Sequence, residues 1–348
     1  MTAPQASAPA GPLLDLQDLV VSYRTRRGPR STRQIRAVDG VSFSVATGEI
    51  LALVGESGCG KTSIVRAIAR LEEPAGGQVL FRGANITHVR GQALRHLRRE
   101  IQVVFQDPFE SLDPRLTAFD TVAESLLVHR MGDSRAGRRE RVLTMLEQVG
   151  LHPAEAIARR YPHQLSGGQR QRLVIAGAMV LGPDLVIADE PVSMLDVSLR
   201  AGILRLMLDL RDQRGVSILF VTHDLSLAWV VADRVAVVYL GRIVEIGPTD
   251  EIIRAPLHPY TRALVSVIPV PETPGPGNGS RRERILLRGE APSASRIPAG
   301  CRFHPRCPLY RQLGEPERCR TEDPALAPSG TEPGPPHAAA CHFVKESS

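Results

Sequence analysis

Nearly uninterrupted apolar runs recur along the chain and end at polar or glycine-containing turns. Four of them cover residues 50–54, 101–105, 185–188 and 217–222, and a candidate strand at residues 19–23 precedes them. Short runs without polar alternation are typical of strands buried on both faces, as in a parallel sheet that helices cover. The pattern therefore predicts an α/β fold with a large core.

Other stretches predict the helices that cover the sheet. Residues 62–70 continue as a helix directly after the strand at 50–54, and residues 173–181 form an apolar helix. The apolar stretch at residues 225–240 is interrupted by two charged residues, at positions 233 and 234. Because no run reaches the length needed to cross a bilayer, the chain is expected to be soluble or peripheral to a membrane.

Composition and charge narrow the class. The chain has 348 residues, 43% hydrophobic and 4% aromatic, which suits one large α/β domain with a small appendage. Its formal net charge is +6, but the short arginine groups at residues 95–99 and 135–141 alternate with helix-forming residues. They are expected to be solvated helix faces, so no nucleic-acid partner is predicted. Residues 1–12 lack the pattern of a secretory signal and are expected to be a disordered tail.

A glycine-rich segment at residues 55–62 follows the first buried strand and precedes a helix. It reads GESGCGKT and fits the P-loop pattern G-x-x-x-x-G-K-[ST]. Only two of the 43 basic residues are lysines, and Lys61 is one of them. Its compact ammonium fits between phosphates, where the wide guanidinium of arginine does not. Backbone N–H groups of the turn and the helix N-terminus complete a nucleotide site. The predicted phosphate-binding residues are Gly55, Glu56, Ser57, Gly58, Cys59, Gly60, Lys61, Thr62 and Ser63.

Two acids, Asp189 and Glu190, follow the apolar run at residues 185–188. They are expected at the carboxyl edge of the parallel sheet, where open α/β sheets bind ligands. In P-loop proteins an aspartate at this place holds Mg²⁺ together with the P-loop hydroxyl, here that of Thr62. Glu190 is then positioned to polarise the water that attacks ATP.

A third motif, LSGGQ at residues 165–169, precedes the apolar helix and resembles the signature of ABC ATPases. Serine and glycines at a helix N-terminus form a second anion-binding site, which here comprises Ser166, Gly167, Gly168 and Gln169. In this family the signature of one cassette completes the ATP site of a partner cassette. The resemblance therefore implies a head-to-tail pair of cassettes with two nucleotides between them.

Further landmarks of the family follow. Tyr23 lies where the family places an aromatic residue that stacks on adenine, and Gln106 matches the glutamine that touches Mg²⁺ and couples to the membrane subunit. Residues 193–196 match the D-loop, with Met194 where alanine is more usual. His223 matches the histidine that contacts the γ-phosphate. All these residues at compatible spacing identify the chain as a member of the ABC ATPases.

The resemblance covers residues 13–268 and implies a P-loop NTPase cassette with a RecA-like core, an antiparallel β subdomain and an α-helical signature subdomain. Residues 106–115, QDPFESLDPR, and residues 258–264, HPYTRAL, are similar to segments of the dipeptide and oligopeptide importer subfamily. That similarity implies ATP- and Mg²⁺-dependent peptide import from the cytoplasmic face of the membrane. The implied partners are a second cassette, two transmembrane permease subunits and an extracytoplasmic binding protein. Nickel or glutathione import, or a regulatory ABC ATPase, remains open.

The composition changes again towards the C-terminus. Residues 269–300 are expected to be a linker rich in Pro and Gly, and residues 301–348 a small cysteine-containing segment. Reduced thiols in a cytoplasmic protein favour metal ligation over disulfides. The segment resembles the C-terminal part of the importer subfamily, some members of which hold a four-iron cluster. The cysteine spacing fits neither zinc fingers nor ferredoxins, so a [4Fe-4S] cluster, Zn²⁺ and unligated thiols all remain open. Its distance in sequence from the phosphate motifs favours a structural purpose. The candidate ligands are Cys301, Cys307, Cys319 and Cys341.

Overall fold

The computed structural model describes most of the chain. The described residues are 11–26, 32–107, 111–132, 134–268, 284–287, 289–290, 292–329 and 336–344. The predicted disordered tail lies outside them apart from residues 11 and 12. Outside them too are residues 269–283 of the predicted linker and residues 108–110 of the segment similar to peptide importers.

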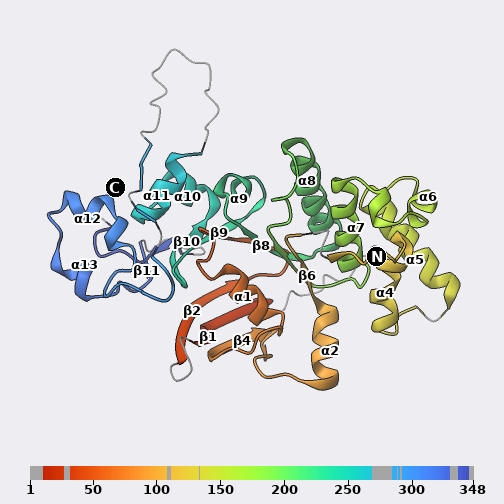
Figure 1. Ribbon diagram of the computed structural model, residues 1–348, viewed down its shortest axis with the longest axis horizontal. Coiled ribbons are helices and arrows are strands. Elements are labelled where there is room, and N and C mark those ends of the chain that lie inside the picture. The colour runs from red at the N-terminus through yellow and green to blue at the C-terminus, as the bar shows by residue number, and fades with distance from the viewer. Residues whose placement is uncertain are drawn as a thin grey trace, which may run out of the picture.

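An eight-stranded sheet forms the centre of the protein, in the order β11-β12-β10-β9-β3-β8-β7-β6 (Figure 1). Its parallel strands are β3 (Ile50–Val54), β6 (Ile101–Val104), β7 (Leu185–Asp189), β8 (Ser217–Thr222) and β9 (Arg234–Tyr239). Antiparallel strands continue it with β10 (Arg242–Pro248), β12 (Ala338–Ala339) and β11 (Ala327–Pro328). Every residue of β3, β7 and β8 is buried, so the predicted α/β fold with buried parallel strands is confirmed.

The central strands separate two hydrophobic cores. Successive side chains of a strand face opposite sides of the sheet. Leu51 and Leu53 of β3 pack with α1 and the smaller second sheet, whereas Ala52 and Val54 pack with helices on the other face. Fully burying a Leu or Val side chain contributes about 1.5–3 kcal/mol relative to exposure, so both cores hold the phosphate-binding strand in place. The helices flanking the sheet are α1 (Lys61–Ile68), α8 (Val197–Arg214), α9 (Leu225–Val231), α10 (Thr249–Arg254) and α11 (Pro259–Ser266).

A second, antiparallel sheet has the strand order β2-β1-β4-β5 and lies with α1 below the main sheet in Figure 1. Its strands are β1 (Leu14–Arg26), β2 (Thr32–Val45), β4 (Gly76–Phe81) and β5 (Ala84–Asn85), and α2 (Gly91–Glu100) follows them. The candidate strand at residues 19–23 is thus the middle of a longer strand. The predicted antiparallel β subdomain is confirmed.

A helical subdomain lies beside the β6 edge of the main sheet, at the right of Figure 1. It comprises α4 (Ala118–Val128), α5 (Arg135–Gln148), α6 (Ala154–Ala158), the 3₁₀ helix η1 (Pro162–Gln164) and α7 (Gly167–Met179). Thr117 and Ser134 begin α4 and α5 by accepting hydrogen bonds from backbone N–H groups, as N-cap residues do. Among the described residues, no helix has the length and apolar character needed to span a bilayer.

The C-terminal segment is joined to the opposite edge of the main sheet. Its strand β12 pairs with β10 through Glu245 and Ile246, and β11 pairs with β12. Three short helices precede these strands: η2 (His304–Arg306), α12 (Pro308–Gln312) and α13 (Glu317–Thr321). The segment is therefore part of the main sheet in space, although it is remote from the other strands in sequence.

Candidate nucleotide site

The phosphate loop connects β3 to α1, and backbone atoms of neighbouring strands lie close to its backbone. Gly60 has φ 110°, a left-handed conformation that residues with a side chain rarely adopt. A Cβ at Gly60 would lie 2.4 Å from the carbonyl oxygen of Ala37, and one at Gly55 would lie 2.2 Å from that of Val238. Both positions therefore require glycine, and the loop is fixed between β2 and β9.

Lys61 points back into the loop. Its Nζ donates to the carbonyl oxygens of Gly55 at 2.6 Å and Glu56 at 3.1 Å, and lies 3.8 Å from Sγ of Cys59. The side chain is only 6% exposed, so its ammonium depends on oxygen partners inside the loop. Phosphate oxygens can replace these carbonyls without moving the charge into an apolar environment. Burial raises the pKa of the neighbouring Cys59 thiol, which keeps it neutral.

Asp189 at the end of β7 lies against the start of α1. The side chain of Thr62 forms a hydrogen bond with its carboxylate, which is buried. Burial, together with the charge of Glu190, raises the pKa of Asp189, and Thr62 and Lys61 offset part of that rise. A buried carboxylate in this situation is stabilised by a cation. Carboxylate and hydroxyl oxygens are ligands that Mg²⁺ accepts.

Glu190 lies between Gln106 and His223. Gln106 Nε2 donates to Glu190 Oε2 at 3.1 Å, and His223 Nδ1 lies 3.1 Å from Glu190 Oε1. The three residues follow β6, β7 and β8, which are neighbours in the sheet, so one sheet edge brings them together. Glu190 has φ 49°, and a strained backbone of this kind costs about 1–3 kcal/mol and is concentrated at functional sites. Ser193 supports the turn, since its Oγ donates to the Glu190 carbonyl oxygen at 3.0 Å.

Tyr23 of β1 reaches the first turn of α1. Its hydroxyl donates to Ser63 Oγ at 3.1 Å, and the side chain is half-buried. The ring thus lies beside the phosphate loop, on the side of the antiparallel sheet. At this place the structure brings together the predicted residues Tyr23, Lys61, Thr62, Ser63, Gln106, Asp189, Glu190 and His223.

The signature residues, 165–169, do not lie beside the phosphate loop. Ser166 begins α7 in a capping box with Gln169: Ser166 N donates to Gln169 Oε1 at 3.0 Å, and Gln169 N donates to Ser166 Oγ at 3.3 Å. In the described part of the chain, the hydrogen bonds of these two residues stay within this helix start. Figure 1 shows α7 in the helical subdomain, apart from α1. Ser166 is exposed, as is Met194 of the D-loop. The structure therefore does not bring the signature to the phosphate loop of its own chain.

The C-terminal segment contacts the phosphate loop at Glu56. Arg306 Nη1 donates to Glu56 Oε1 at 3.1 Å and to Oε2 at 3.0 Å, and Tyr260 Oη accepts from Glu56 N at 3.1 Å. Nothing in the sequence singles out Arg306, since it is one arginine among many. Tyr260 belongs to the HPYTRAL segment, but that pattern indicates a subfamily and not a contact with the loop. The segment is distant from the phosphate motifs in sequence, but the expectation that it is also remote from them in space is wrong for Arg306. The fold brings this residue into contact with Glu56 of the loop.

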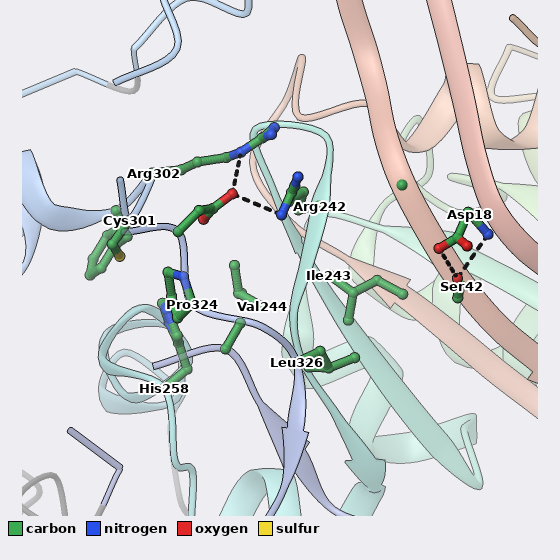
Figure 2. Close-up of a pocket in the computed structure, with 14 residues that line it drawn as sticks. Asp18, Ser42, Arg242, Ile243, Val244, His258, Cys301, Arg302, Pro324 and Leu326 are labelled. Atoms are coloured by element: carbon green, nitrogen blue, oxygen red, sulfur yellow. Dashed lines mark hydrogen bonds and ion pairs between the residues drawn. The ribbon is translucent and has the colours of Figure 1, made fainter. Parts of the chain in front are cut away.

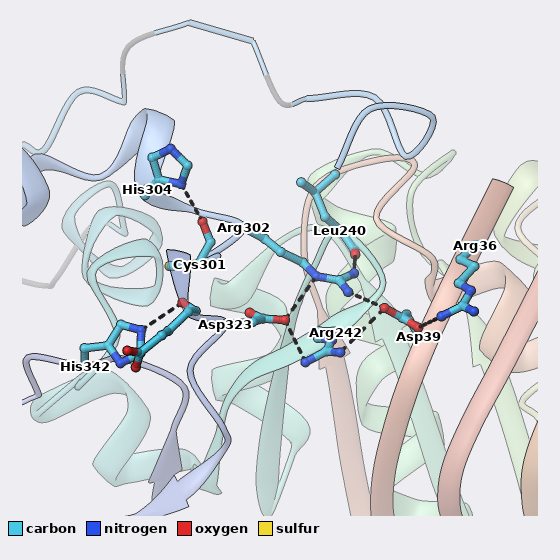
Figure 3. Close-up of polar contacts among 10 residues, drawn as sticks. Arg36, Asp39, Leu240, Arg242, Cys301, Arg302, His304, Asp323 and His342 are labelled. Atoms are coloured by element: carbon cyan, nitrogen blue, oxygen red, sulfur yellow. Dashed lines mark hydrogen bonds and ion pairs between the residues drawn. The ribbon is translucent and has the colours of Figure 1, made fainter. Parts of the chain in front are cut away.

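The four C-terminal cysteines line one small cavity. Burial raises the pKa of Cys301 to about 12 and that of Cys307 to about 11, and the neighbouring thiols add to both shifts. Within the described residues, however, no three His, Cys, Asp or Glu side chains are placed to ligate one metal ion. His304 and His342 instead bond to the carbonyl oxygens of Cys301 and Glu322, at 2.8 and 2.9 Å (Figure 3).

A second cavity lies where the C-terminal segment meets β10 and the antiparallel sheet (Figure 2). Arg242 and Arg302 line it, and both pair with Asp323 and Asp39 (Figure 3). Burial raises the pKa of Asp39, but the hydrogen bonds and charges of Arg302, Arg36 and Arg242 together outweigh it and hold the pKa below its usual value. The two arginines are thus neutralised by carboxylates, and the cluster joins the segment to the body of the protein.

Comparisons with known proteins identify the family. Residues 38–193 match the ABC transporter family, and residues 244–312 match the C-terminal region of oligopeptide/dipeptide transporters. The chain is 45% identical over 334 residues to the oligopeptide transport ATP-binding protein AppF of Bacillus subtilis, a match that covers 95% of this chain and 97% of that relative. The chain belongs to the ATP-binding proteins of ABC transporters.

Other relatives support the assignment of this chain to the ATP-binding proteins of ABC transporters. The glutathione import ATP-binding protein GsiA of Pectobacterium atrosepticum is 48% identical over 297 residues, which are 84% of this chain and 46% of that longer relative. A dimeric ATP-binding cassette in a post-hydrolysis state, bound to ADP and Pi, superposes with a TM-score of 0.60 at 29% identity. It covers 68% of this chain and 98% of its own. The predicted P-loop NTPase cassette, its ATPase class and its need for ATP and Mg²⁺ are confirmed.

Proposed function

We propose that this chain hydrolyses ATP to power the import of dipeptides and oligopeptides. The observation that carries the proposal is the joining, in one fold, of the phosphate loop, the neighbouring Gln106–Glu190 pair and an oligopeptide/dipeptide C-terminal region. The name and near full-length similarity of AppF support the substrate class. Glutathione is the alternative that a relative supports, through GsiA. Nickel import or a regulatory ATPase has no such support among these relatives.

The geometry supports a division of labour at the site. Residues 55–63 would hold the phosphates through backbone N–H groups, with Lys61 between them and Tyr23 against adenine. Thr62, Asp189 and Gln106 would hold Mg²⁺, since they supply oxygen atoms beside the loop. Glu190 would act as general base on the attacking water.

His223 would contact the γ-phosphate. The 3.1 Å contact between His223 Nδ1 and Glu190 Oε1 supports this role, because it links a group that senses the terminal phosphate to the base. The second such contact, from Gln106, links the same carboxylate to the proposed Mg²⁺ site. Both contacts would orient the lone pairs of Glu190 towards a water molecule.

We propose that the complete ATP site forms between two cassettes. The helix start at Ser166, Gly167, Gly168 and Gln169, of which Ser166 is exposed, would cover the nucleotide of the partner. The dimeric state of the similar cassette bound to ADP and Pi supports this arrangement. Two transmembrane permease subunits, an extracytoplasmic binding protein and a position on the cytoplasmic face of the membrane complete the proposed assembly.

The proposed division of the chain places the cassette at residues 13–268, a linker at 269–300 and the C-terminal segment at 301–348. The ATP-binding face lies in the cassette, and the helical subdomain beside β6 would meet the permease subunits. Uptake of a labelled peptide by vesicles that hold the assembled transporter tests the function. A regulatory ATPase would bind ATP and give no such uptake.

We further propose that the four C-terminal cysteines hold a metal centre, either a [4Fe-4S] cluster or Zn²⁺. Support comes from four thiols around one cavity, which is the donor set that both centres take. A bound cation would favour the thiolate forms and offset the burial that now disfavours them. Its contribution would be structural, since it would tie the turns of a segment with little core of its own.

Protein purified without oxygen is expected to contain four iron and four sulfide per chain, or one zinc. Metal analysis is the decisive measurement, because buried thiols with raised pKa values also react slowly with alkylating reagents when no metal is bound. Cys307→Ser, which removes one proposed ligand, should lower the metal content, whereas Cys59→Ser outside the segment should not. Absence of both metals from anaerobically purified protein would contradict the proposal.

A further inference from the structure

Residues 301–306 of the C-terminal segment pack against β9 and α11, which both lie beside the phosphate loop. Phe303 is buried, and its ring centroid lies 5.2 Å from that of Tyr239 on β9 and 5.4 Å from that of Tyr260 on α11. Aromatic rings at such distances attract each other beyond the effect of their burial. The ring therefore fixes the positions of the two tyrosines whose hydroxyl groups lie beside Glu56 and Arg306.

Arg302 fixes the neighbouring β9–β10 turn. Its Nη1 donates to the carbonyl oxygen of Leu240 at 2.5 Å, and its Nη2 pairs with Asp39 (Figure 3). The next residue of that turn, Gly241, donates from its N to the carbonyl oxygen of Cys59 in the phosphate loop at 2.8 Å. One hydrogen-bonded path thus leads from Arg302 to the loop backbone.

Arg306 forms the most direct contact. Its side chain is 9% exposed, and its Nη1 donates to both carboxylate oxygens of Glu56 and to Tyr239 Oη at 3.5 Å. Charge-assisted hydrogen bonds between partly buried groups are stronger than exposed pairs. The guanidinium carbon also lies 6.0 Å from the ring centroid of Tyr239, a distance at which a cation and an aromatic face attract each other.

Glu56 is consequently held on three sides. Tyr260 binds its N–H, Lys61 Nζ binds its carbonyl oxygen, and Arg306 binds its side chain. A loop this rich in glycine has a wide choice of backbone conformations unless other groups restrict it. Binding is tighter when the restriction is already present before the ligand arrives, because less conformational entropy is then lost.

We propose that Arg306 is a positioning residue for nucleotide binding, which acts through Glu56 to hold the phosphate loop in its binding conformation. The C-terminal segment is then a part of the ATP site, in addition to any role in stability or metal binding. The proposal concerns the nucleotide and does not depend on which solute is transported. Arg306 contacts a loop residue and not the reacting atoms, so its effect should fall on affinity and not on the chemical step.

Arg306→Gln in the full chain is expected to weaken the binding of a fluorescent ATP analogue by about 3- to 10-fold, the range for residues that modulate a site through one neighbour. In the assembled transporter the same change should raise the KM for ATP by a similar factor with kcat near the wild-type value. Arg318→Gln is the matched control, since Arg318 is an exposed residue of the same segment and pairs with Glu322, the residue that follows α13. It should leave both constants unchanged.

A double-mutant cycle with Glu56→Gln separates positioning from general destabilisation. If Arg306 acts through Glu56, the double variant should bind the analogue no more weakly than the weaker-binding single variant. Glu56→Gln also provides the test if Arg306→Gln does not fold. Wild-type affinity in either single variant, or losses in the two single variants that multiply in the double variant, would overturn the proposal. A fall in thermal stability without a change in affinity would overturn it as well.

Discussion

Glu190→Gln is expected to bind ATP normally and to hydrolyse it about 10²- to 10⁴-fold more slowly, which is the range for loss of a positioned general base. Glutamine keeps the size of the side chain and one oxygen that can accept from Gln106 or His223, but it cannot take a proton from water. The change should therefore affect the chemical step alone. Single-turnover hydrolysis and equilibrium binding of a fluorescent ATP analogue measure the two effects separately.

The control for Glu190→Gln is Glu140→Gln, at an exposed carboxylate on α5. It should hydrolyse ATP at the wild-type rate. Both cassettes of the assembly must be defined, because an intact sibling site could sustain turnover when the other site is blocked. Turnover near wild type with Glu190→Gln in every hydrolytic site would remove this residue from the role of base.

Lys61→Arg is expected to weaken nucleotide binding as much as Lys61→Ala, by about 10- to 100-fold. That range corresponds to the loss of hydrogen bonds to a charged group, worth about 1.5–3 kcal/mol. The ammonium of Lys61 fits within 2.6 Å and 3.1 Å of two loop carbonyls, in a space that is almost closed to solvent. A planar guanidinium is too wide for that space, although it has the same charge.

Equilibrium titration of both Lys61 variants with the fluorescent ATP analogue measures this effect. Arg66→Lys provides the reverse exchange on the same helix, at an exposed position, and should leave affinity unchanged. Retention of affinity in Lys61→Arg, but not in Lys61→Ala, would show that a positive charge is sufficient and that its shape is unimportant.

The parallel sheet and the phosphate edge could be predicted from the sequence because local patterns determine them. The apolar runs at residues 50–54 and 217–222 are strands with these bounds, and the helix after the loop begins one residue earlier than predicted. Parallel strands align their carboxyl ends, so Gln106, Glu190 and His223 had to meet at one edge. The regular geometry of a parallel sheet thus determines where the residues that follow its strands lie in space.

The contact between the C-terminal segment and the phosphate loop could not be predicted in this way. Arg306 and Glu56 are separated by 250 residues, and no periodic pattern connects them. Their meeting depends on two short strands, β12, which pairs with β10, and β11, which pairs with β12, and on Phe303 packing between two tyrosines. Strands of two residues are too short to leave a recognisable pattern. Tertiary packing alone places this arginine.

Uptake of a labelled oligopeptide into vesicles tests the central claim most directly. The vesicles would hold the complete transporter, with ATP supplied to the side on which this chain lies and the binding protein on the other side. The account predicts that uptake requires ATP and peptide-loaded binding protein. When Glu190→Gln replaces the wild-type chain, the rates of ATP hydrolysis and of peptide uptake should both fall. Peptide uptake that is unchanged by Glu190→Gln, or ATP turnover by the wild-type transporter without any uptake of peptide, would contradict it.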